Sequence, residues 1–497
     1  MQLKVSVDSI TVIKVDTLIA FVTQEETTSS GTLKQLDGFT EGAITTLYES
    51  EQFNGEESTS ALIYPAVGFK SKQLLLVGLG ESSKVDQDCF RRAIGSVSRH
   101  QSLKGSASAA FSLGKYSKPE YYQAVVEGCL LGKYRILDWK SGDSRHDSHR
   151  LASLTALIPK RQMARSVDKA INRGTIIAEG QILARDLSFT PSNMLTPVMF
   201  AKKAQELARK HKLSFKALDQ QAIEKEKMGA YLSVTKGSTE PPRFVILQYK
   251  GAAASQKPIV LVGKGVMFDS GGISLKAGLN MHEMKQDMTG AAVVLSTIVT
   301  AARLGIKRNI VALVAACENM PAGNASKPGD VVTARNGKTI EIINTDAEGR
   351  LTLADALDYA NKFDPQAVID IATLTGAALY ILGYAGAPIT GNNKRLLDQI
   401  EVASLGTGEH VWQMPLWDEY RESMKGDCAD LVNAGVRAAG TLCAAAFLEN
   451  FIGDWPWAHV DIAYMDNEPK GRPYLPKGAT GWGVRLLTDV LENWKKV

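Results

Sequence analysis

Short runs rich in Val, Ile and Leu recur along the chain, separated by stretches whose apolar residues return at helical spacing. The runs predict strands, which we expect at 2–7, 17–22, 73–77, 154–158, 244–249, 259–263, 309–316, 367–372 and 459–462. The stretches predict helices at 86–98, 121–131, 164–187, 289–304, 351–361 and 441–451. Because continuous apolar strands alternate with helices, we predict an α/β protein whose sheet is covered by helices on both faces.

A polar, somewhat basic segment at 133–173 interrupts this pattern. The chain has 497 residues, too many for one ordinary core, so two domains are expected. We place the boundary in this segment and predict a smaller N-terminal α/β domain, residues 1–165, and a larger C-terminal α/β domain, residues 166–497. Charge runs are most often solvated surface, but a nucleic-acid contact is an alternative. The basic residues concerned are His146, His149, Arg150, Lys160, Arg161 and Arg165.

Composition narrows the class of protein. A net charge of +4 is too small to indicate nucleic-acid binding by itself, because such binding needs a clustered basic face. The five cysteines are scattered without a C-x-x-C pair, which indicates reduced thiols in a cytosolic protein rather than disulfides or a zinc–thiolate site. The first fifteen residues lack the pattern of a signal peptide, and no apolar run approaches the length of a transmembrane helix. We therefore expect a cytoplasmic protein without a membrane partner.

The octet Asn344–Leu351 concentrates charge in few positions. It places Asp346, Glu348 and Arg350 between an apolar run and an expected helix, which is where ligands bind in open α/β sheets. Two carboxylates at i and i+2 cannot share a helix face, but on a turn they can converge on a cation. The alternative is structural, because Thr345 and Glu348 match the S/T-x-x-E capping box of a helix start. Arg350 argues mildly against capping, since a cation there opposes the helix dipole.

A second stretch also carries charges of both signs. A buried strand leads into a glycine-rich loop, and the charged residues that follow are Lys264, Asp269, Lys276 and Asp287. If this strand and the apolar run 340–343 are neighbours in one sheet, these side chains share a crevice with the octet. Buried carboxylates need cations beside them, and oxygen-rich clusters most often hold divalent metals. Two metals would activate a water molecule and polarise a carbonyl or phosphoryl oxygen.

Other interpretations of this second stretch are weaker. The lysines alone would neutralise the carboxylates in a structural ion-pair network. Ser270 offers a hydroxyl nucleophile, but no histidine stands out as its base. The motifs H-E-x-x-H and G-x-S-x-G are absent, so neither of those two hydrolase plans applies.

Together the two stretches resemble the signature of the leucine aminopeptidase (cytosol aminopeptidase) family, two-metal enzymes that remove N-terminal residues from peptides. The octet NTDAEGRL matches the family hallmark without change, and residues 263–287 match in type and spacing. Further matches lie at 372–376, 458–463 and 478–481. The resemblance is strong over about 170–495 and covers the N-terminal part in general layout only. It implies a catalytic C-terminal domain, for which we expect a mixed, mostly parallel sheet.

The resemblance implies two divalent metal ions per subunit, for which zinc, manganese and magnesium are all candidates. One ion would be held by Asp269, Asp346 and Glu348. The other would be held by Lys264, Asp269, Asp287 and Glu348. An amine ligand requires a neutral Lys264, which an adjacent dication enforces by lowering the lysine pKa. The metals would also bind the free α-amine of the substrate.

The resemblance implies the catalytic groups as well. Lys276 would hydrogen-bond the scissile carbonyl and the oxyanion formed from it. The general base would be a bicarbonate ion held by Arg350, because a guanidinium suits a planar, bidentate oxyanion. The metal-bridging water would give its proton to that ion and attack the amide. Thr373 and Leu374 would offer main-chain groups to the substrate. The residues expected to line the site are Asn344 and Met284.

Some positions depart from the family pattern or fit no role in it. Met267 and Thr289 stand where smaller or different residues are common. The sequence Tyr464-Met465-Asp466 replaces small residues near the side-chain pocket of relatives, which puts the preference for leucine in doubt. Ordinary core packing explains Met284 as well as site lining does. The residues that we interpret as structural are His459, in the core, and Asp427 and Asp430, at turns and caps.

The resulting expectation is a cytoplasmic, metal-dependent aminopeptidase that acts on peptides, prefers leucine and other apolar N-terminal residues, and forms a homohexamer with active sites facing an inner cavity. A two-metal phosphoesterase is a rival, because the clamp chemistry is shared. A DNA-binding role of the N-terminal domain is a second rival, motivated by the basic segment and by bacterial members of the family that have such a role.

Overall fold

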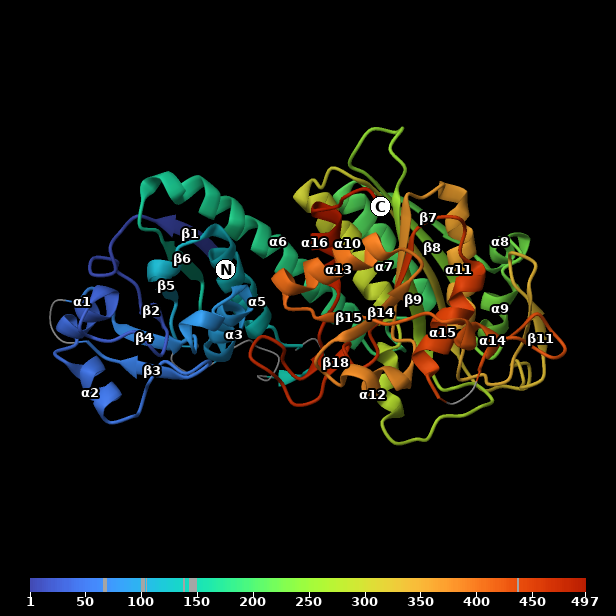
Figure 1. Ribbon diagram of the computed structural model, residues 1–497, viewed down its shortest axis with the longest axis horizontal. Helices are drawn as coiled ribbons and strands as arrows, with labels where there is room; N and C mark the ends of the chain where they lie inside the picture. The colour runs from blue at the N-terminus through green and yellow to red at the C-terminus, as the bar shows by residue number, and fades with distance from the viewer. Residues whose placement is uncertain (66–68, 100–102, 104, 137–138, 143–149, 436–437) are drawn as a thin grey trace. The chain divides into compact units, whose positions relative to one another are not determined.

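The computed structural model describes residues 1–65, 69–99, 103, 105–136, 139–142, 150–435 and 438–497 (Figure 1). The chain forms two compact units, the first from residues 1–179 and 469–477 and the second from residues 180–468 and 478–497. The helix α6 (Ala164–Phe189) contains the point where the chain passes from the first unit to the second. Of the expected basic segment, His146 and His149 lie outside the described residues.

The first unit is built on a six-stranded sheet with the order β1-β6-β5-β2-β4-β3. Its strands are β1 (Gln2–Ser6), β2 (Thr17–Val22), β3 (Ser60–Ile63), β4 (Gln73–Gly78), β5 (Ser108–Ser112) and β6 (Ser153–Leu157). Its helices, besides the start of α6, are α1 (Gly31–Phe39), α2 (Ala43–Glu49), α3 (Gln87–Ser98) and α5 (Pro119–Lys133). Alternate residues of β2 point to opposite faces: Ile19 packs with α3 and α5, and Leu18 packs with α1 and α2.

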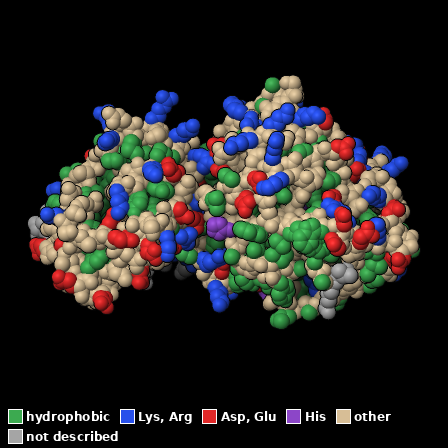
Figure 2. Space-filling view, in the orientation of Figure 1, with side chains coloured by type: hydrophobic (Ala, Val, Ile, Leu, Met, Phe, Trp, Pro, Cys, Tyr) green, Lys and Arg blue, Asp and Glu red, His purple; other side chains and the backbone are tan. Residues whose placement is uncertain are grey.

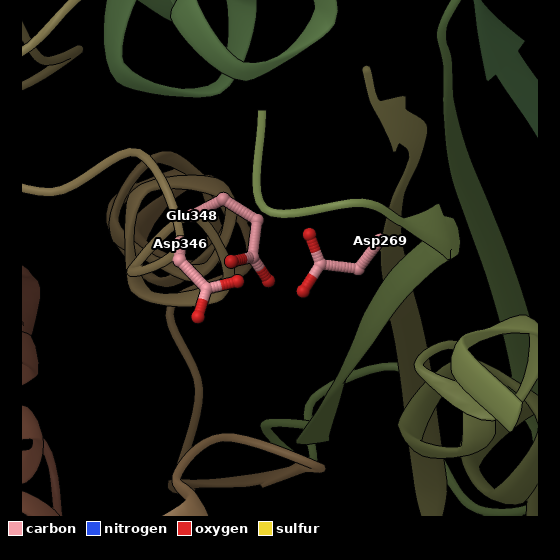
Figure 3. Close-up of side chains that lie close together, drawn as sticks. All are labelled: Asp269, Asp346 and Glu348. Atoms are coloured by element: carbon pink, nitrogen blue, oxygen red, sulfur yellow. The ribbon is translucent and has the colours of Figure 1, made fainter. Parts of the chain in front are cut away.

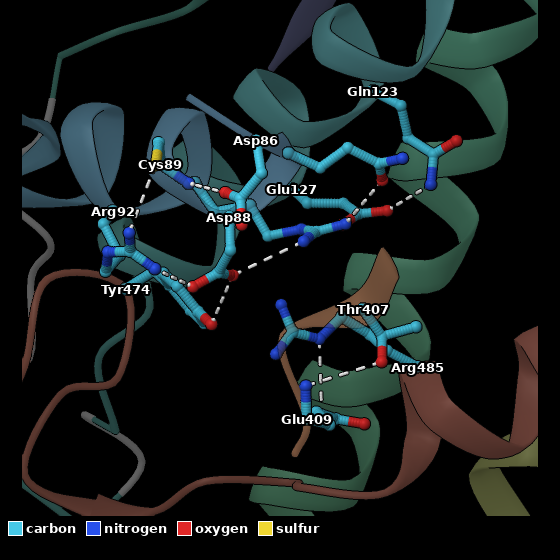
Figure 4. A network of polar contacts seen from close by, with 12 residues as sticks. Asp86, Asp88, Cys89, Arg92, Gln123, Glu127, Thr407, Glu409, Tyr474 and Arg485 are labelled. Atoms are coloured by element: carbon cyan, nitrogen blue, oxygen red, sulfur yellow. Dashed lines mark hydrogen bonds and ion pairs between the residues drawn. The ribbon is translucent and has the colours of Figure 1, made fainter. Parts of the chain in front are cut away.

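Residues Pro469–Lys477 belong to this first unit although they follow most of the second unit in the sequence. The hydroxyl of Tyr474 donates a hydrogen bond of 2.9 Å to Asp88 on α3 (Figure 4). A methyl group on Gly95 of α3 would lie 2.8 Å from the Cβ of Tyr474, so this close approach requires glycine. The segment is thus packed onto α3, and we call it the strap.

The second unit is built on an eight-stranded sheet with the order β15-β14-β17-β13-β9-β10-β8-β7. These strands are β7 (Ser214–Leu218), β8 (Arg243–Lys250), β9 (Ile259–Asp269), β10 (Asn309–Asn319), β13 (Ala367–Ala372), β14 (Ala387–Gly391), β15 (Val411–Gln413) and β17 (Trp457–Asp461). Short strands outside this sheet are β11 (Val331–Thr333), β12 (Thr339–Glu341), β16 (Leu431–Val432), β18 (Asn467–Glu468) and β19 (Gly478–Ala479). The central strands β17, β13, β9 and β10 are parallel, so they end at the same edge.

Helices cover both faces of this sheet, as Figure 1 shows. On one face lie α7 (Pro197–His211), α10 (Thr289–Leu304), α13 (Lys394–Thr407) and α16 (Val484–Glu492). On the other lie α8 (Gln220–Lys225), α9 (Gly229–Thr235), α11 (Gly349–Ala360) and α15 (Gly440–Leu448). Two short helices, α12 (Leu379–Leu382) and α14 (Asp418–Glu422), complete the unit. Along β9, Leu261 joins the first core and Val260 and Val262 join the second, and the predicted α/β class with a mixed, mostly parallel sheet is confirmed.

Two expectations from the sequence were wrong in detail. The apolar run 340–343 is not a strand of the central sheet, because only Thr339–Glu341 is extended and it pairs in a separate three-stranded sheet with β11 and β16. Contrary to the second expectation, the described residues hold one helical stretch, Met281–Leu304, that by length and composition alone could cross a membrane. The most apolar window of that stretch is 83% buried inside the protein, which identifies α10 as a core helix.

Candidate metal centre

Three carboxylates converge at the edge where the central strands end (Figure 3). Asp269 is the last residue of β9, and Asp346 and Glu348 lie on the turn that precedes α11. One oxygen from each of the three lies within 4.8 Å of the others. The Nζ atom of Lys276 lies 2.8 Å from Asp269 Oδ2 and 2.5 Å from Asp346 Oδ1. Residues from both charged stretches of the sequence therefore meet in one cluster.

Lys264 extends from β9 into the same cluster and is 3% exposed. Its Nζ atom lies 2.8 Å from Glu348 Oε1 and donates to Asp287 Oδ1 at 2.8 Å and to the carbonyl oxygen of Thr373 at 2.9 Å. Asp287 also accepts a hydrogen bond of 2.8 Å from the Thr373 hydroxyl. A methyl group on Gly349 would lie 2.5 Å from the Lys264 side chain, which explains the glycine inside the octet.

Burial dominates the electrostatics of the cluster. It raises the pKa of Asp269, Asp287 and Asp346, and the lysines oppose this rise. For Lys264 and Lys276 burial disfavours the charged form, but the surrounding carboxylates outweigh it and the pKa of both ammonium groups is raised. In the chain alone, the two lysines therefore stay charged and partly neutralise the carboxylates.

The carboxylates nevertheless have more acceptor atoms than the described residues satisfy. Asp287 Oδ2 is buried and accepts a hydrogen bond from none of the described residues. Asp346 Oδ1 and Glu348 Oε1 each have an ammonium as their only nearby cation among the described residues, at 2.5 Å from Lys276 and 2.8 Å from Lys264. A carboxylate-rich donor set with unsatisfied oxygen atoms suits divalent cations, which take oxygen ligands and neutralise them. The residues present fit the metal ions that the sequence resemblance implies.

Arg350, the second residue of α11, is 8% exposed. Its Nη1 donates to the carbonyl oxygen of Asn433 at 2.8 Å, while its Nε has no partner among the described residues. Burial lowers the pKa of Arg350 to about 10, so the guanidinium remains charged at neutral pH. A buried cation with an unused donor suits a small anion.

The residues expected to contact substrate border the cluster, but some already have partners. The Thr373 carbonyl accepts from Lys264, and the Leu374 N–H donates to Asp461 Oδ1 at 3.1 Å. Asn344 turns its side-chain oxygen back to accept from the N–H of Asp346 at 2.9 Å, so it shapes the turn. The half-buried Met284 belongs to the 3-10 helix Met281–Gln286 just before Asp287.

The capping-box interpretation of the octet was wrong. The N-cap of α11 is Glu348, and its side chain makes no capping hydrogen bond. The Thr345 hydroxyl instead donates to the carbonyl oxygen of Gly271 at 2.6 Å and accepts from the N–H of Ser274 at 2.7 Å. Thr345 therefore joins the octet to the glycine-rich loop after β9.

Sequence reasoning missed two asparagines that hold the cluster. Asn319, at the end of β10, donates 2.8 Å to Asp269 Oδ1 and 3.0 Å to the carbonyl oxygen of Thr345. The carbonyl of the same residue accepts the hydroxyl of Ser270 at 2.7 Å, so that serine is a structural group. Asn433 donates a hydrogen bond of 2.7 Å from its side-chain amide to the carbonyl oxygen of Asn344. Its side-chain oxygen accepts a hydrogen bond of 2.8 Å from the N–H of Ile343. Neither asparagine stands in a motif, so no pattern pointed to it.

Asp461 was also missed, although the matched stretch 458–463 contained it. It is fully buried at the end of β17. Its carboxylate accepts from the N–H of Leu374, from the Thr375 hydroxyl at 2.7 Å and from the N–H of Ala463 at 3.2 Å. It thus fixes the segment after β13 and the turn after β17 together.

His459 was expected to be a core histidine, and this is confirmed. It is 1% exposed on β17, and its Nδ1 lies 2.5 Å from Asp370 Oδ1 on β13. Trp457 donates from its indole N–H to the other oxygen of Asp370 at 2.7 Å. The pair contributes no ligand to the cluster described above.

Comparison with protein-family models gives two matches. Residues 182–488 match the catalytic domain of the cytosol aminopeptidase family, and residues 18–143 match the N-terminal domain of the same family. Among curated proteins, a probable cytosol aminopeptidase of Geobacter sp. (strain M21) is 44% identical over 93% of this chain and 94% of its own length. A probable cytosol aminopeptidase of Syntrophotalea carbinolica is 42% identical over 99% of this chain and all of its own length.

Solved structures agree with these matches. A mutant of tomato leucine aminopeptidase has a TM-score of 0.89 and 32% identity, covering 99% of this chain and 96% of its own. The bottromycin maturation enzyme BotP in complex with Mn has a TM-score of 0.83 and 32% identity, covering 96% and 99%. Both family domains, in order and over nearly the whole chain, therefore accompany the carboxylate and lysine cluster. This chain belongs to the cytosol aminopeptidase family of metal-dependent aminopeptidases.

Proposed function

We propose that this aminopeptidase releases N-terminal amino acids from peptides with two divalent metal ions, manganese or zinc and also magnesium, bound per subunit. The residues that would hold them are Asp269, Asp346 and Glu348 for one ion, and Lys264, Asp269, Asp287 and Glu348 for the other. Bound there, the ions would activate a water molecule and polarise the scissile carbonyl. The observation that carries the proposal is the convergence of Asp269, Asp346 and Glu348, in a cluster with carboxylate oxygens that have no hydrogen-bond partner among the described residues. The manganese bound to BotP supports manganese as a candidate.

Lys276 is proposed as the electrophilic group. In the chain alone its ammonium is paired with Asp269 and Asp346. With metal ions bound to those carboxylates, the Lys276 ammonium would be free to donate a hydrogen bond to the carbonyl oxygen of the substrate. Negative charge develops on that oxygen during attack, and a fixed ammonium stabilises it.

Arg350 is proposed to hold the general base, a bicarbonate ion that takes the proton of the attacking water. The support is the charged, buried guanidinium with an unused Nε donor. Asn433 fixes the orientation of the guanidinium by accepting from its Nη1. A lysine at this position would present a single charged point instead of a planar fork, so it would orient the anion poorly.

The expected substrates are peptides with a free N-terminus, with leucine and other apolar residues preferred at that end. Met284 and Asn344 are proposed to line the site, and Thr373 and Leu374 to present main-chain groups. The relatives named cytosol aminopeptidase support a cytoplasmic location. The homohexamer stays a prediction, which a monomeric mass in light scattering would contradict.

The test is release of the chromophore from a leucyl anilide by the purified protein. It is measured as prepared, after chelation, and after manganese or zinc is restored. We expect chelation to abolish cleavage and metal to restore it. Arg350→Ala should lower kcat/KM by about a hundredfold or more, because a general base contributes about that factor. A matched control is Arg395→Ala, an arginine on α13 outside the cluster, which should keep full activity.

Either of two results would overturn the proposal. Cleavage that survives complete removal of metal would exclude the two-metal site. An Arg350→Ala protein that binds metal and keeps full activity would exclude the role of Arg350. Phosphoesters serve as a further control, and we expect none to be cleaved.

A nucleic-acid contact through the N-terminal unit stays a separate prediction. On the face shown in Figure 2, lysine and arginine side chains lie among acidic ones instead of forming one uniform patch. Nucleic-acid binding depends strongly on salt because counterions are released. A gel-shift assay that finds no salt-sensitive binding at low ionic strength would exclude it.

A further inference from the structure

The buried carboxylate of Asp461 binds two successive main-chain N–H groups of the segment after β13. Its Oδ1 atom accepts a hydrogen bond of 3.1 Å from the Leu374 N–H and one of 3.5 Å from the Thr375 N–H. Successive N–H groups that converge in this way form a concave site for an anion, called a nest. Here the anion is a fully buried side chain of the protein itself. The nest therefore binds no external ligand but fixes the direction of two peptide units.

The direction of these N–H groups decides where the carbonyl groups of the same segment point. In a planar trans peptide unit the carbonyl is antiparallel to the N–H of the next residue, and no peptide bond of the described chain is cis. The Thr373 carbonyl therefore points away from Asp461, and it accepts a hydrogen bond of 2.9 Å from Lys264 Nζ. The Leu374 carbonyl also points away from Asp461, because the Thr375 N–H points toward it.

The two carbonyl groups differ in what they bind. The Thr373 carbonyl is used by Lys264, whereas the Leu374 carbonyl accepts no hydrogen bond from the residues that the structure describes. Leu374 is only half-buried, and the Thr373 hydroxyl beside it donates a hydrogen bond of 2.8 Å to Asp287 in the cluster. An accessible carbonyl next to the proposed metal centre, held in a fixed direction, suits an N–H group of a peptide.

A second anchor reaches this segment from α15. The Thr375 hydroxyl donates a hydrogen bond of 2.7 Å to Asp461 Oδ2, and its oxygen atom lies 2.7 Å from that of the Thr441 hydroxyl. Because the Thr375 proton is used for Asp461, Thr441 is the donor in this second pair. Asp461 Oδ1 also accepts from the Ala463 N–H at 3.2 Å. The segment is thus held by β17 and α15 together, so that little ordering remains to be done when a substrate binds.

We propose that Asp461 is a positioning residue of the reaction, because its carboxylate directs the Leu374 carbonyl toward the substrate and so orients the scissile amide at the metal centre. This proposal rests on the proposed aminopeptidase function and deepens it. Asp461 does not touch the substrate but acts through Leu374, whose carbonyl accepts a hydrogen bond from the scissile N–H. An ester has an oxygen atom in place of that N–H, so its cleavage gains nothing from the directed carbonyl.

The test compares leucyl-glycine with leucyl-glycolate, the ester that has oxygen in place of the scissile N–H. Both release leucine, so one assay of the manganese-loaded protein measures both. Asp461→Ala should lower kcat/KM for the peptide about tenfold more than for the ester, the effect of one lost hydrogen bond. Asp461→Asn keeps an acceptor oxygen, so it should stay within about threefold of the wild type with both substrates. Thr375→Val should lower the peptide-to-ester ratio by about threefold.

Asp355→Ala is the matched control. Asp355 is also a buried carboxylate that binds main-chain N–H groups, because it accepts from Tyr231 at 2.8 Å and from Arg335 at 2.7 Å. Its loss should lower the thermal midpoint, as the loss of Asp461 does, and should leave the peptide-to-ester ratio unchanged.

The outcomes separate the two proposals. Equal losses for peptide and ester in Asp461→Ala would overturn the positioning role, because the carboxylate would then be purely structural. An Asp461→Asn protein that loses as much of the peptide-to-ester ratio as Asp461→Ala would overturn it as well. If Asp461→Ala does not fold, Thr375→Val carries the test, and an unchanged ratio in that variant overturns the proposal. Failure of the manganese-loaded wild type to cleave either substrate would instead overturn the proposed aminopeptidase function.

Discussion

In the N-terminal unit, Arg91 places its Nε 2.6 Å from Glu127 and its Nη1 3.4 Å from Asp88. The remaining oxygen of Glu127 accepts from Gln123 at 2.6 Å, and Asp88 accepts from Tyr474 (Figure 4). In the catalytic unit, by contrast, the buried cluster keeps carboxylate oxygens that accept no hydrogen bond from the residues that the structure describes. Both units bury charge, but only the N-terminal network is matched atom for atom.

This difference separates structural charge from functional charge. A buried ion pair persists when its remaining donors and acceptors are filled, because unpaired buried charge is strongly unfavourable. A buried cluster whose carboxylate oxygens lack hydrogen-bond donors is stabilised when a ligand such as a cation binds to them. Strongly shifted pKa values are common at such functional sites. The same substitution, glutamate to glutamine, made in each unit tests whether the two kinds of buried charge differ in this way.

The largest effect is expected from Glu348→Gln in the catalytic cluster. Loss of a metal ligand removes several kcal/mol of transition-state stabilisation, so kcat/KM for a leucyl anilide should fall about a thousandfold or more. Under chelation the thermal midpoint should not fall, because the charge removed was in excess. Kinetics with manganese and a melting curve with chelator check both parts. If the Glu348→Gln variant keeps a tenth of the wild-type activity, Glu348 is not a metal ligand.

Glu127→Gln in the N-terminal unit should do the reverse. It leaves Arg91 buried without its main partner, which typically lowers the free energy of unfolding by about 3 to 5 kcal/mol. The specific activity of the folded fraction should stay at the wild-type value. Urea unfolding and active-site kinetics measure the two quantities. A large loss of activity at full stability would mean that the two units do not differ in the way described.

Asn433→Ala tests whether the hydrogen bonds that hold the octet in place are as important for activity as the carboxylates of the octet. Removing a residue that orients ligands commonly weakens metal affinity or activity by about 10- to 100-fold. We expect a higher manganese concentration for half-maximal activity and a lower kcat at saturation. Asn336→Ala, an exposed asparagine that donates to the carbonyl oxygen of Asn450, serves as the matched control. An unchanged metal requirement would reduce Asn433 to a purely structural role.

The smallest effect is expected at His459, and it should depend on pH. Burial disfavours its charged form, but Asp370 outweighs burial and raises the pKa of His459 above 6.5. A raised pKa in the folded state means that the stabilisation is complete below pH 6.5 and is lost as pH rises through the folded pKa. His459→Gln should therefore lower the free energy of unfolding by about 1.5 to 3 kcal/mol at pH 6 and by less at pH 9. An equal loss at both pH values would contradict a charged pair.

The sequence predicted the elements whose signal is local. The helix at 289–304 and the strand at 367–372 have the expected bounds, because each is a continuous apolar segment bounded by residues that end it. The run 340–343 failed because an apolar segment this short does not specify which sheet it joins. The start of α7 follows a general rule of helix ends, because its first residue is Pro197, a position where a missing N–H is harmless.

The charged residues of the site could be predicted from the sequence, but the residues that hold them in place by hydrogen bonds could not. The octet and the glycine-rich loop hold their chemistry in contiguous motifs, so the carboxylates and lysines could be named in advance. Asn433 and Asp461 act across 89 and 87 positions of sequence, on Asn344 and Leu374, and no local pattern indicates those partners. Partners so distant become visible only when the chain is folded.

The strap has a consequence for how the chain is made. When residues 1–179 have been synthesised, all six strands of the first sheet are present, but Tyr474, which donates a hydrogen bond to Asp88, is not yet made. Domains commonly fold in order from the N-terminus during synthesis. Here the first unit stays incomplete until almost the last stretch of the message has been translated. Expressing the two halves as separate polypeptides would accordingly divide the first unit, and the N-terminal piece alone would leave the surface of α3 around Gly95 exposed.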